Sequence, residues 1–189
     1  MNVEYVTLFF IFLFSFLILC KPNKNIIKIN YHNIDYFVMN DEKANRKVEI
    51  LNELNRRTSL LMDYFKENNY FDNDNIKKLY DNYKPNNLAE NVDNDYTAYS
   101  IDKKKIKICM LNDNGELIND INTSMFVLIH ELAHIMTTET GHTPNFWNNM
   151  KTLLIHSIDL DIYKYIDYTI DPVNYCGSYI NHSPYIIKK

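Results

Sequence analysis

The sequence predicts an α+β fold, in which helices and short strands build one compact domain behind an apolar N-terminal segment. Three observations support this prediction. The chain has 189 residues, which is enough for one domain with a substantial core. Two long stretches repeat their apolar residues at helical spacing. Several short apolar runs of strand length stand between turn signals.

The composition is that of a folded globular protein. Hydrophobic residues make up 46% and charged residues 23%, which lies outside the range of disordered chains. The net charge of -4 gives no global basic field, so nothing indicates a nucleic-acid partner. The cysteines Cys20, Cys109 and Cys176 are widely spaced and odd in number. This spacing predicts reduced, mostly buried thiols rather than a disulfide framework.

An apolar run from Tyr5 to Cys20 opens the chain. With its flanks, residues 3–21, it is long enough to cross a bilayer as one helix. The sequence therefore predicts a transmembrane anchor over residues 1–22 and one domain over residues 23–189. A cleaved signal peptide is the alternative, but no basic residue precedes the run and no small-residue cleavage site follows it. Lysines after the run and Glu4 before it place the domain on the cytoplasmic side, which fits unpaired cysteines.

The first half of the domain is predicted to hold one strand, two helices and a hairpin. Asn23 to Asn33 reads as a polar tether that leads to a strand, IDYFVM. A long helix is expected from about Asp41, because six apolar residues follow at helical spacing: Val48, Leu51, Leu54, Leu61, Met62 and Phe65. The segment NDNIKKLYDNY is expected to form a shorter helix, and KPNNLAENVDND a loop. TAYSI and KIKICML flank DKKK as a β-hairpin, and NDNG forms a tight turn.

Two helices are expected in the second half. The first begins with Asn122 or Thr123 as its N-cap, and its run MFVLIHELAHIM is apolar on nearly every side, which predicts a central, buried helix. Gly141 ends this segment. Thr143 and Pro144 then start the second helix, which packs back against the first through one apolar face.

The stretch HELAHIMTTETGH holds three of the six histidines of the chain. Residues four apart share one face of a helix, so His130 and His134 can direct two imidazole nitrogens at one point, with Glu131 beside it. A catalytic zinc ion takes three protein ligands and keeps one position for water. The metal lowers the pKa of that water and polarises a carbonyl, while Glu131 accepts the proton as general base. The spacing therefore predicts a Zn2+ site for hydrolysis.

His142 is the expected third ligand, because the chain turns at Gly141 and presents this histidine just before the second helix. Acidic alternatives are Asp159, Asp161 and Glu139. The alternative to a metal site is a helix whose polar residues align by chance. It is disfavoured because H-E-x-x-H arises by chance in such a chain about one time in a hundred. Burying several ionisable side chains without a ligand also costs several kcal/mol.

The motif HELAH, followed after seven residues by HTPNFW, resembles the zinc peptidases with SprT-like and WLM domains. The resemblance widens to TAYSIDKKKIKICML and DPVNYCG, and is strongest to membrane-anchored metallopeptidases of large DNA viruses. It covers about Thr97 to Tyr185, and it implies a zincin-like domain with a small, mostly antiparallel sheet. It also implies zinc on His130, His134 and His142 with catalytic Glu131, at a viral or host membrane.

Other residues are weaker candidates. Tyr168, Tyr175 and Tyr179 can hydrogen-bond an oxyanion, although packing is the commoner role of tyrosine. Cys176 can approach the zinc as an inhibitory thiolate, although a buried thiol is more usual. The strand from Ile106 to Met110 can offer an edge to an extended peptide.

The two remaining histidines near the second helix are expected to be solvated. His156 falls on the polar side of that helix, and His182 lies in a loop-like stretch.

The sequence thus predicts a membrane-tethered zinc metallopeptidase that acts on a protein or peptide. The alternative is a membrane-tethered scaffold that keeps zinc for stability, but a structural site has no use for Glu131. A zinc hydrolase of a non-peptide amide is a further alternative. Nothing in the sequence fixes the oligomeric state.

Overall fold

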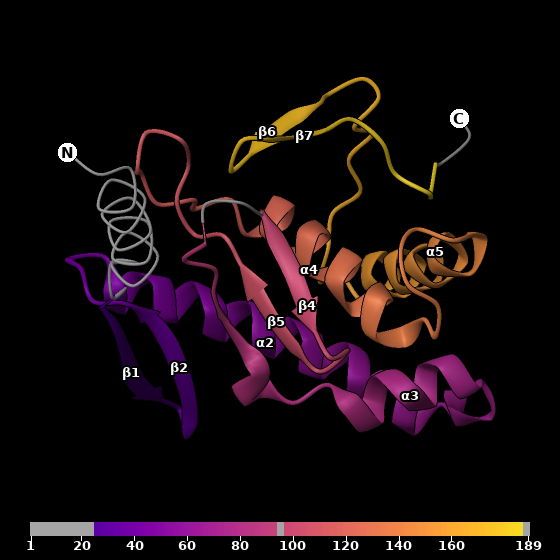
Figure 1. Ribbon diagram of the computed structural model, residues 1–189. Coiled ribbons are helices and arrows are strands. Elements are labelled where there is room, and N and C mark those ends of the chain that lie inside the picture. The colour runs from indigo at the N-terminus through magenta and orange to yellow at the C-terminus, as the bar shows by residue number, and fades with distance from the viewer. Residues whose placement is uncertain (1–24, 94–96, 187–189) are drawn as a thin grey trace, which may run out of the picture.

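A computed structural model describes residues 25–93 and 97–186, and these residues form an α+β domain (Figure 1). In chain order the helices are α2 (Ala44–Glu67), α3 (Asp74–Asn82), α4 (Ile121–Met136) and α5 (Pro144–Asp159), with two short 3-10 helices, η1 (Tyr70–Asp72) and η2 (Pro85–Asn87). The strands are β1 (Ile26–Tyr31), β2 (Ile34–Met39), β3 (Leu88–Glu90), β4 (Ala98–Ile101), β5 (Lys105–Ile108), β6 (Val173–Tyr175) and β7 (Ser178–Ile180).

Helix α2 confirms the long helix expected after Asp41. Its predicted apolar stripe is buried in full: Val48, Leu51, Leu54, Leu61, Met62 and Phe65. The helix begins three residues later than expected, because Asp41 stays outside it. The Asp41 carboxylate accepts a hydrogen bond from the backbone of Lys43 (2.9 Å) and pairs with the ammonium of Lys47 (2.6 Å). This carboxylate therefore holds the entry to the helix from outside.

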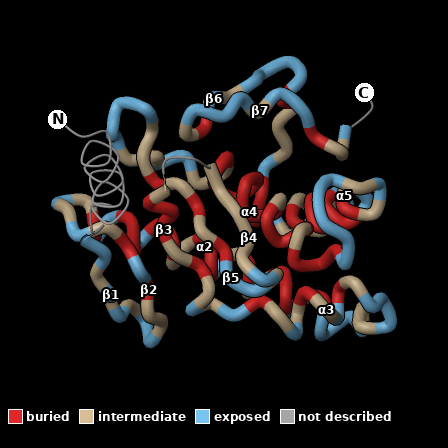
Figure 2. The backbone as a smooth tube through the Cα atoms, viewed as in Figure 1, coloured by how far each residue is buried: buried red, intermediate tan, exposed pale blue. Residues whose placement is uncertain are grey.

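Helix α4 is the centre of the domain, as its all-round apolar sequence predicts. It packs against α2, α3 and α5, and Figure 2 shows it among the most buried parts of the chain. Its N-cap is Asp120 rather than Asn122 or Thr123. The Asp120 carboxylate accepts hydrogen bonds from the backbone N–H groups of both those residues, at 2.9 and 3.1 Å. Aspartate is among the preferred N-cap residues, and its negative charge also suits the positive end of the helix dipole.

The strands form three small sheets among the described residues, where one mostly antiparallel sheet was expected. Strands β1 and β2 pair antiparallel, as do β6 and β7. The third sheet has the order β3-β5-β4, with β3 parallel and β4 antiparallel to β5. The expected hairpin of β4 and β5 is confirmed, and Figure 1 shows it lying over α4. Strand β5 is therefore central, so the edge that borders α4 belongs to β4.

Two segments expected to lack regular structure contain strands. The predicted tether from Asn23 to Asn33 includes β1, whose Ile27, Ile29 and Tyr31 are half-buried. The lysine and asparagine between them face outward, so the segment looks merely polar in sequence. The predicted loop KPNNLAENVDND likewise contains η2 and β3, and β3 is held by a partner strand more than fifteen residues away. Pairing across such a distance leaves no local signal.

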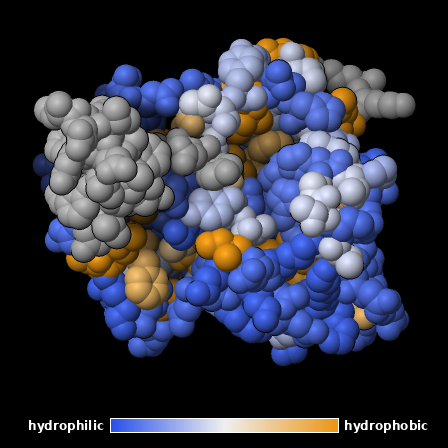
Figure 3. All heavy atoms as spheres, in the orientation of Figure 1, coloured by the Kyte–Doolittle hydropathy of each residue, from blue (hydrophilic) through white to orange (hydrophobic). Residues whose placement is uncertain are grey.

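The predicted membrane anchor, residues 3–21, lies outside the described residues, as does the boundary at residue 22. Within residues 25–93 and 97–186, no helix combines the length and the apolar character needed to cross a bilayer. Figure 3 shows a mainly hydrophilic face, with hydrophobic side chains gathered near the β1–β2 hairpin. Ile26 and Phe37, each 44% exposed, belong to this hairpin.

Candidate metal centre

Helix α4 supplies the first two histidines of the candidate centre. His130 and His134 are one turn apart, and the centroids of their rings are 5.0 Å from each other. Both rings are half-buried, whereas the residues between them on α4 are buried. The helix therefore presents two imidazoles toward the same side, as the four-residue spacing predicts.

His142 joins them from the segment between α4 and α5. Helix α4 ends at Met136, and the chain passes through Gly141 in a left-handed conformation with φ of 83° before it reaches this histidine. The Nε2 atoms of His142 and His130 are 3.0 Å apart, and one ligand nitrogen from each of the three histidines lies within 4.8 Å of the other two. Two nitrogens on one tetrahedral zinc ion, each about 2.1 Å from it, are about 3.4 Å apart. The structure thus brings together the three predicted ligands.

Phe146 is the platform on which the three imidazoles rest. Its fully buried ring lies 4.9, 4.3 and 4.7 Å from the rings of His130, His134 and His142. Trp147 packs beside it and lies 5.4 Å from His142. These two side chains come from the first turn of α5, which begins with the Thr143 cap (3.3 Å to the Phe146 N–H) and Pro144, as predicted. The start of α5 therefore packs against all three imidazole rings.

Glu131 stands next to the histidines and is buried, with 4% of its surface exposed. Its Oε2 atom has no hydrogen-bond partner among the described residues. Burial raises the pKa of this carboxyl from its ordinary value to about 8. Burial, with the neighbouring imidazoles as a smaller cause, lowers the pKa of His130 to about 3 and that of His134 to about 4. The fold therefore favours neutral imidazoles, which is the form that binds metals.

A cavity of about 480 Å³ opens in front of the histidines. One wall is strand β4 with its turn, and the other is the segment from Glu139 to His142. The lining residues are Ala98, Tyr99, Ser100, Asp102, Lys103, His130, Glu131, His134, Glu139, Thr140, Gly141 and His142. The candidate centre is thus reachable from outside the domain, along the edge of a strand.

The acidic alternatives for the third ligand do not join the cluster. Asp159 and Asp161 follow at the far end of α5, and neither belongs to the group of converging ligand atoms. Glu139 lines the cavity, but its carboxylate accepts a hydrogen bond from the side chain of Asn145 at 3.0 Å. His142 is therefore the side chain that completes the histidine pair.

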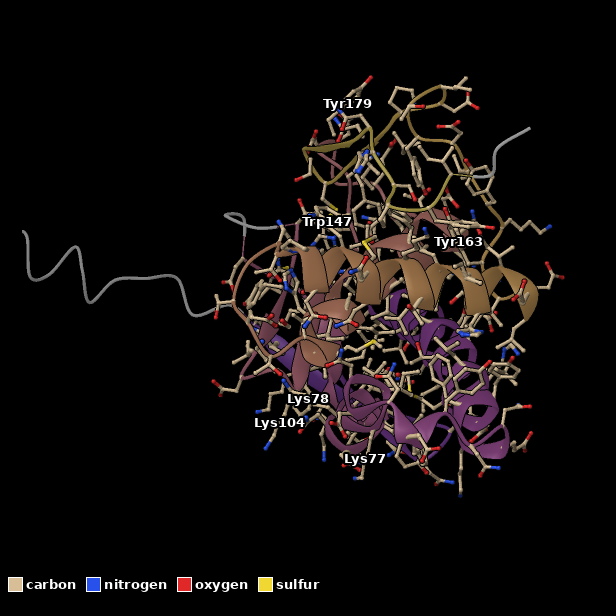
Figure 4. All side chains as sticks on the ribbon, turned by 90° about the vertical axis from the view of Figure 1, so that its right-hand side faces the viewer. Lys77, Lys78, Lys104, Trp147, Tyr163 and Tyr179 are labelled. Atoms are coloured by element: carbon tan, nitrogen blue, oxygen red, sulfur yellow. A yellow bond between two sulfur atoms is a disulfide. The ribbon has the colours of Figure 1, made fainter. Side chains whose placement is uncertain are left out.

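The three tyrosines considered as oxyanion donors lie elsewhere. Tyr168 is buried against Phe126, and the hydroxyl of Tyr175 donates to the carbonyl of Cys109 at 2.9 Å. Tyr179 is 64% exposed and stands on the β6–β7 hairpin, apart from Trp147 (Figure 4). None of the three lines the cavity beside the histidines. In two of them the hydroxyl is buried at a packing site, the commoner role of tyrosine.

The two remaining histidines near α5 are placed differently from each other. His156 was expected to be solvated, but its ring packs among Tyr64, Phe65 and Tyr70, with centroids 5.0 to 5.4 Å away. This prediction was wrong, because the aromatic partners come from α2 and η1. His182 is exposed, as expected, and its ring lies 5.9 Å from that of Trp147.

The prediction of reduced thiols at Cys109 and Cys176 was also wrong. The two residues form a disulfide that closes a separation of 67 residues, with their Cα atoms 6.4 Å apart. This bond lies in a separate cavity of about 420 Å³, so Cys176 is no inhibitory thiolate at the histidines. Disulfides persist in oxidising compartments, and the argument from unpaired cysteines for a cytoplasmic domain is therefore lost.

The fold and the site together define a class: an α+β protein with a candidate three-histidine metal centre on its central helix. Comparison with known proteins also shows to which family the chain belongs. The chain is 38% identical to "Uncharacterized protein R325" of Acanthamoeba polyphaga mimivirus over 173 residues, which cover 85% of this chain and 84% of that protein. The chain belongs to the same family as this mimivirus protein.

Shorter similarities reach two iridescent viruses. "Uncharacterized protein 042R" of Invertebrate iridescent virus 3 is 38% identical over 73 residues, or 39% of this chain and 45% of that protein. "Uncharacterized protein 136R" of Invertebrate iridescent virus 6 is 35% identical over 83 residues, or 43% of this chain and 46% of that protein. No family model and no solved structure matches the chain.

Proposed function

We propose that this protein is a zinc metallopeptidase with a WLM- or SprT-like, zincin-like domain. The observation that carries the proposal is the convergence of His130, His134 and His142 beside the buried carboxyl of Glu131. Three nitrogen donors with an open cavity in front suit a catalytic zinc ion, which keeps one position free. A structural site is usually closed by a fourth side chain, and none joins these three among the described residues.

A metal-bound water beside the three histidines would also account for a buried oxygen atom at the site that has no hydrogen-bond partner among the described residues. The Oε2 atom of Glu131 is buried without a hydrogen bond from any described residue, which is costly unless a ligand or a reacting water takes it up. A bound zinc ion would polarise the substrate carbonyl and lower the pKa of a water molecule. Glu131 accepts the proton from the attacking water and passes it to the leaving amine.

The substrate in this proposal is an extended peptide that pairs with β4. The backbone N–H of Cys109 donates to the carbonyl of Thr97 at 2.9 Å, so this pair is one of the hydrogen-bonded pairs of the β4–β5 ladder. Because such pairs alternate, the N–H and C=O groups of Ala98 and Ser100 point away from β5. Both residues line the cavity, so a peptide there can add as a strand and lie across the histidines.

Membrane attachment is part of the same proposal. Residues 3–21 anchor the domain in a viral or host membrane, and the lysines that follow them favour the cytoplasmic side, whereas the Cys109–Cys176 disulfide favours an oxidising compartment. A protease-protection assay on vesicles that carry the full chain tests this orientation. The vesicles are prepared so that they expose their cytoplasmic face. A domain that resists added protease until these vesicles are opened would overturn the cytoplasmic orientation.

The experiment that tests the activity compares the full chain in detergent with Glu131→Gln and His142→Ala. We expect about one zinc ion per wild-type chain, and cleavage of unfolded casein that Glu131→Gln lowers by at least ~100-fold while keeping zinc. His142→Ala should bind zinc much more weakly but measurably, because His130 and His134 remain. Bound zinc without cleavage of any protein would support a zinc-binding scaffold instead, and cleavage unchanged in Glu131→Gln would remove this residue from its role.

A further inference from the structure

The segment that carries His142 is held by an ammonium group that belongs to neither helix. Lys103 lies in the turn between β4 and β5, and its Nζ donates to three successive carbonyls that begin at Thr137, the C-cap of α4. The distances are 2.5 Å to Thr137, 2.8 Å to Thr138 and 2.7 Å to Glu139. An ammonium has three protons to donate, so these contacts use all of them. Lys103 lines the cavity, but it has no donor left for a substrate.

A second lysine supports the same corner from α3. The Nζ of Lys78 lies 3.2 Å from the carbonyl of Thr137 and 3.3 Å from the hydroxyl of Thr138. Figure 4 shows Lys78 on the same side of the molecule as Lys104, the neighbour of Lys103. The carbonyl of Thr137, which both lysines contact, lies at the negative end of α4 and has no partner within the helix. Two cations at this point are therefore well placed to fix where the chain leaves α4.

The backbone conformation of Lys103 is a second, independent observation about the position of its side chain. Asp102 and Lys103 both have φ of 52°, the left-handed conformation of both central residues in a type I′ turn. Aspartate tolerates this conformation, whereas a lysine there costs on the order of 1 kcal/mol compared with glycine. The hydrogen bonds of the side chain offset this cost, because bonds from a charged donor are the strong ones.

The side chain of Thr137 also ties this corner to α4 and α5. The hydroxyl of Thr137 donates to the carbonyl of Ala133 at 2.7 Å and accepts from the side chain of Asn149 at 2.9 Å. Only two residues separate Glu139, the last carbonyl held by Lys103, from His142. A shift of these carbonyls therefore moves the third ligand relative to His130 and His134, which stay fixed on the helix.

We propose that Lys103, assisted by Lys78, is a positioning residue for the metal centre that sets the place of His142. The inference rests on the proposed function, because it takes His142 as a zinc ligand. It also joins two parts of the site. The turn that carries Lys103 ends β4, so the strand that receives the peptide and the segment that carries the third ligand are held by one side chain.

The test is a zinc titration of the full chain in detergent against a chromophoric chelator. Lys103→Met is expected to weaken zinc binding about tenfold, the lower end of the effect of residues that orient metal ligands. Lys103→Arg retains the charge and several donors, and should recover most of the loss. Lys104→Met is the matched control, since Lys104 is exposed in the same turn, and it should stay within about twofold of wild type.

A double mutant separates positioning from a general effect on folding. In the His142→Ala background, Lys103→Met should weaken zinc no further, because the ligand it positions is absent. With cobalt in place of zinc, Lys103→Met should also change the visible absorption spectrum, which reports ligand geometry. The proposal is overturned if Lys103→Met matches Lys104→Met, or if its effect persists without His142.

Two further controls keep the result interpretable. If Lys103→Met does not fold, Lys78→Met takes its place, with an expected weakening of about threefold from its longer contacts and Lys77→Met as control. No difference between these two would equally overturn the proposal. Wild-type protein that binds no zinc would contradict the proposed function itself. Equal zinc binding by wild type and variant would contradict only the positioning role of the lysine.

Discussion

Glu131 is a carboxyl group that the fold buries beside neutral imidazoles. Its pKa of about 8 in the metal-free protein, against 4.5 ordinarily, means that the folded state binds a proton that the unfolded state has released between these values. Stability therefore falls as pH rises from 4.5 to 8, and it is constant with respect to this group above 8. A buried ionisable group that lowers the stability of the metal-free protein is typical of a functional site.

We expect Glu131→Gln to remove this pH dependence in the metal-free protein. The difference between variant and wild type should change by about 3–5 kcal/mol from pH 4.5 to pH 8 in favour of the variant. Urea unfolding in the presence of a chelator, at several pH values, measures it. The histidines titrate equally in both proteins and cancel in the comparison. A difference independent of pH would contradict the burial of this carboxyl.

At the scale of elements, a buried ion pair joins α2 to β2 and β3. The ammonium of Lys47 is fully buried and lies 2.6 Å from Asp41 and 2.7 Å from Glu90. The other oxygen of Glu90 accepts a hydrogen bond from the backbone N–H of Met39 at 2.6 Å. These contacts tie the long helix to the strand that pairs with β5, and thereby support the sheet that borders the cavity.

Replacing Lys47 by methionine should destabilise the domain by about 3–5 kcal/mol, because two carboxylates lose their shared cation while one of them stays buried. Chemical denaturation measures the change. Lys43→Met is a control at the N-cap of the same helix, since the Lys43 ammonium pairs with the exposed Glu42 at 3.3 Å. Equal stability of the two variants would show that the pair is dispensable.

The edge of β4 that faces away from β5 leads to a second prediction at the scale of elements. Ser100→Pro removes one N–H that points into the cavity, and we expect the KM for unfolded casein to rise about tenfold with zinc affinity unchanged. Ser100→Ala retains the N–H and is the control. Steady-state kinetics distinguishes the two, and an unchanged KM in the proline variant would exclude pairing at this residue.

At the scale of the whole molecule, the C-terminal hairpin is attached by a disulfide and by the buried Tyr175. The disulfide between Cys109 and Cys176 joins the end of β5 to the turn between β6 and β7. Thr97 and Ser178 share a hydrogen bond beside it, and the hydroxyl of Tyr175 donates to the carbonyl of Cys109. Figure 1 shows this hairpin standing above the domain, away from α3.

Cys176→Ser should therefore lower the free energy of unfolding by about 2–4 kcal/mol. A reducing agent should have the same effect on wild type and none on the variant. Cys20→Ser is the control, and it should resemble wild type. Zinc affinity is expected to change little, because the histidines come from α4 and the segment before α5. Insensitivity of wild type to reduction would contradict the disulfide.

The sequence by itself determined the features that depend on short-range order. Helical spacing of apolar residues predicted α2, a run that is apolar on nearly every side predicted α4, and Thr143 with Pro144 predicted the start of α5, because each of these signals is local. The same local geometry gave the pair His130 and His134 with Glu131 between them. The alternation on either side of DKKK gave the β4–β5 hairpin, and Gly141 gave the turn before His142.

Only the tertiary structure decided which distant residues meet. It brought His142, and neither Asp159 nor Asp161, to His130 and His134, placed Phe146 beside the rings, and brought Lys103 to the end of α4. Phe146 looked like a core residue and Lys103 like part of a polar turn, so neither carried a local signal. The strands β1 and β3 and the disulfide were likewise missed. Each depends on a contact between separate parts of the chain, which is decided by packing rather than by local period.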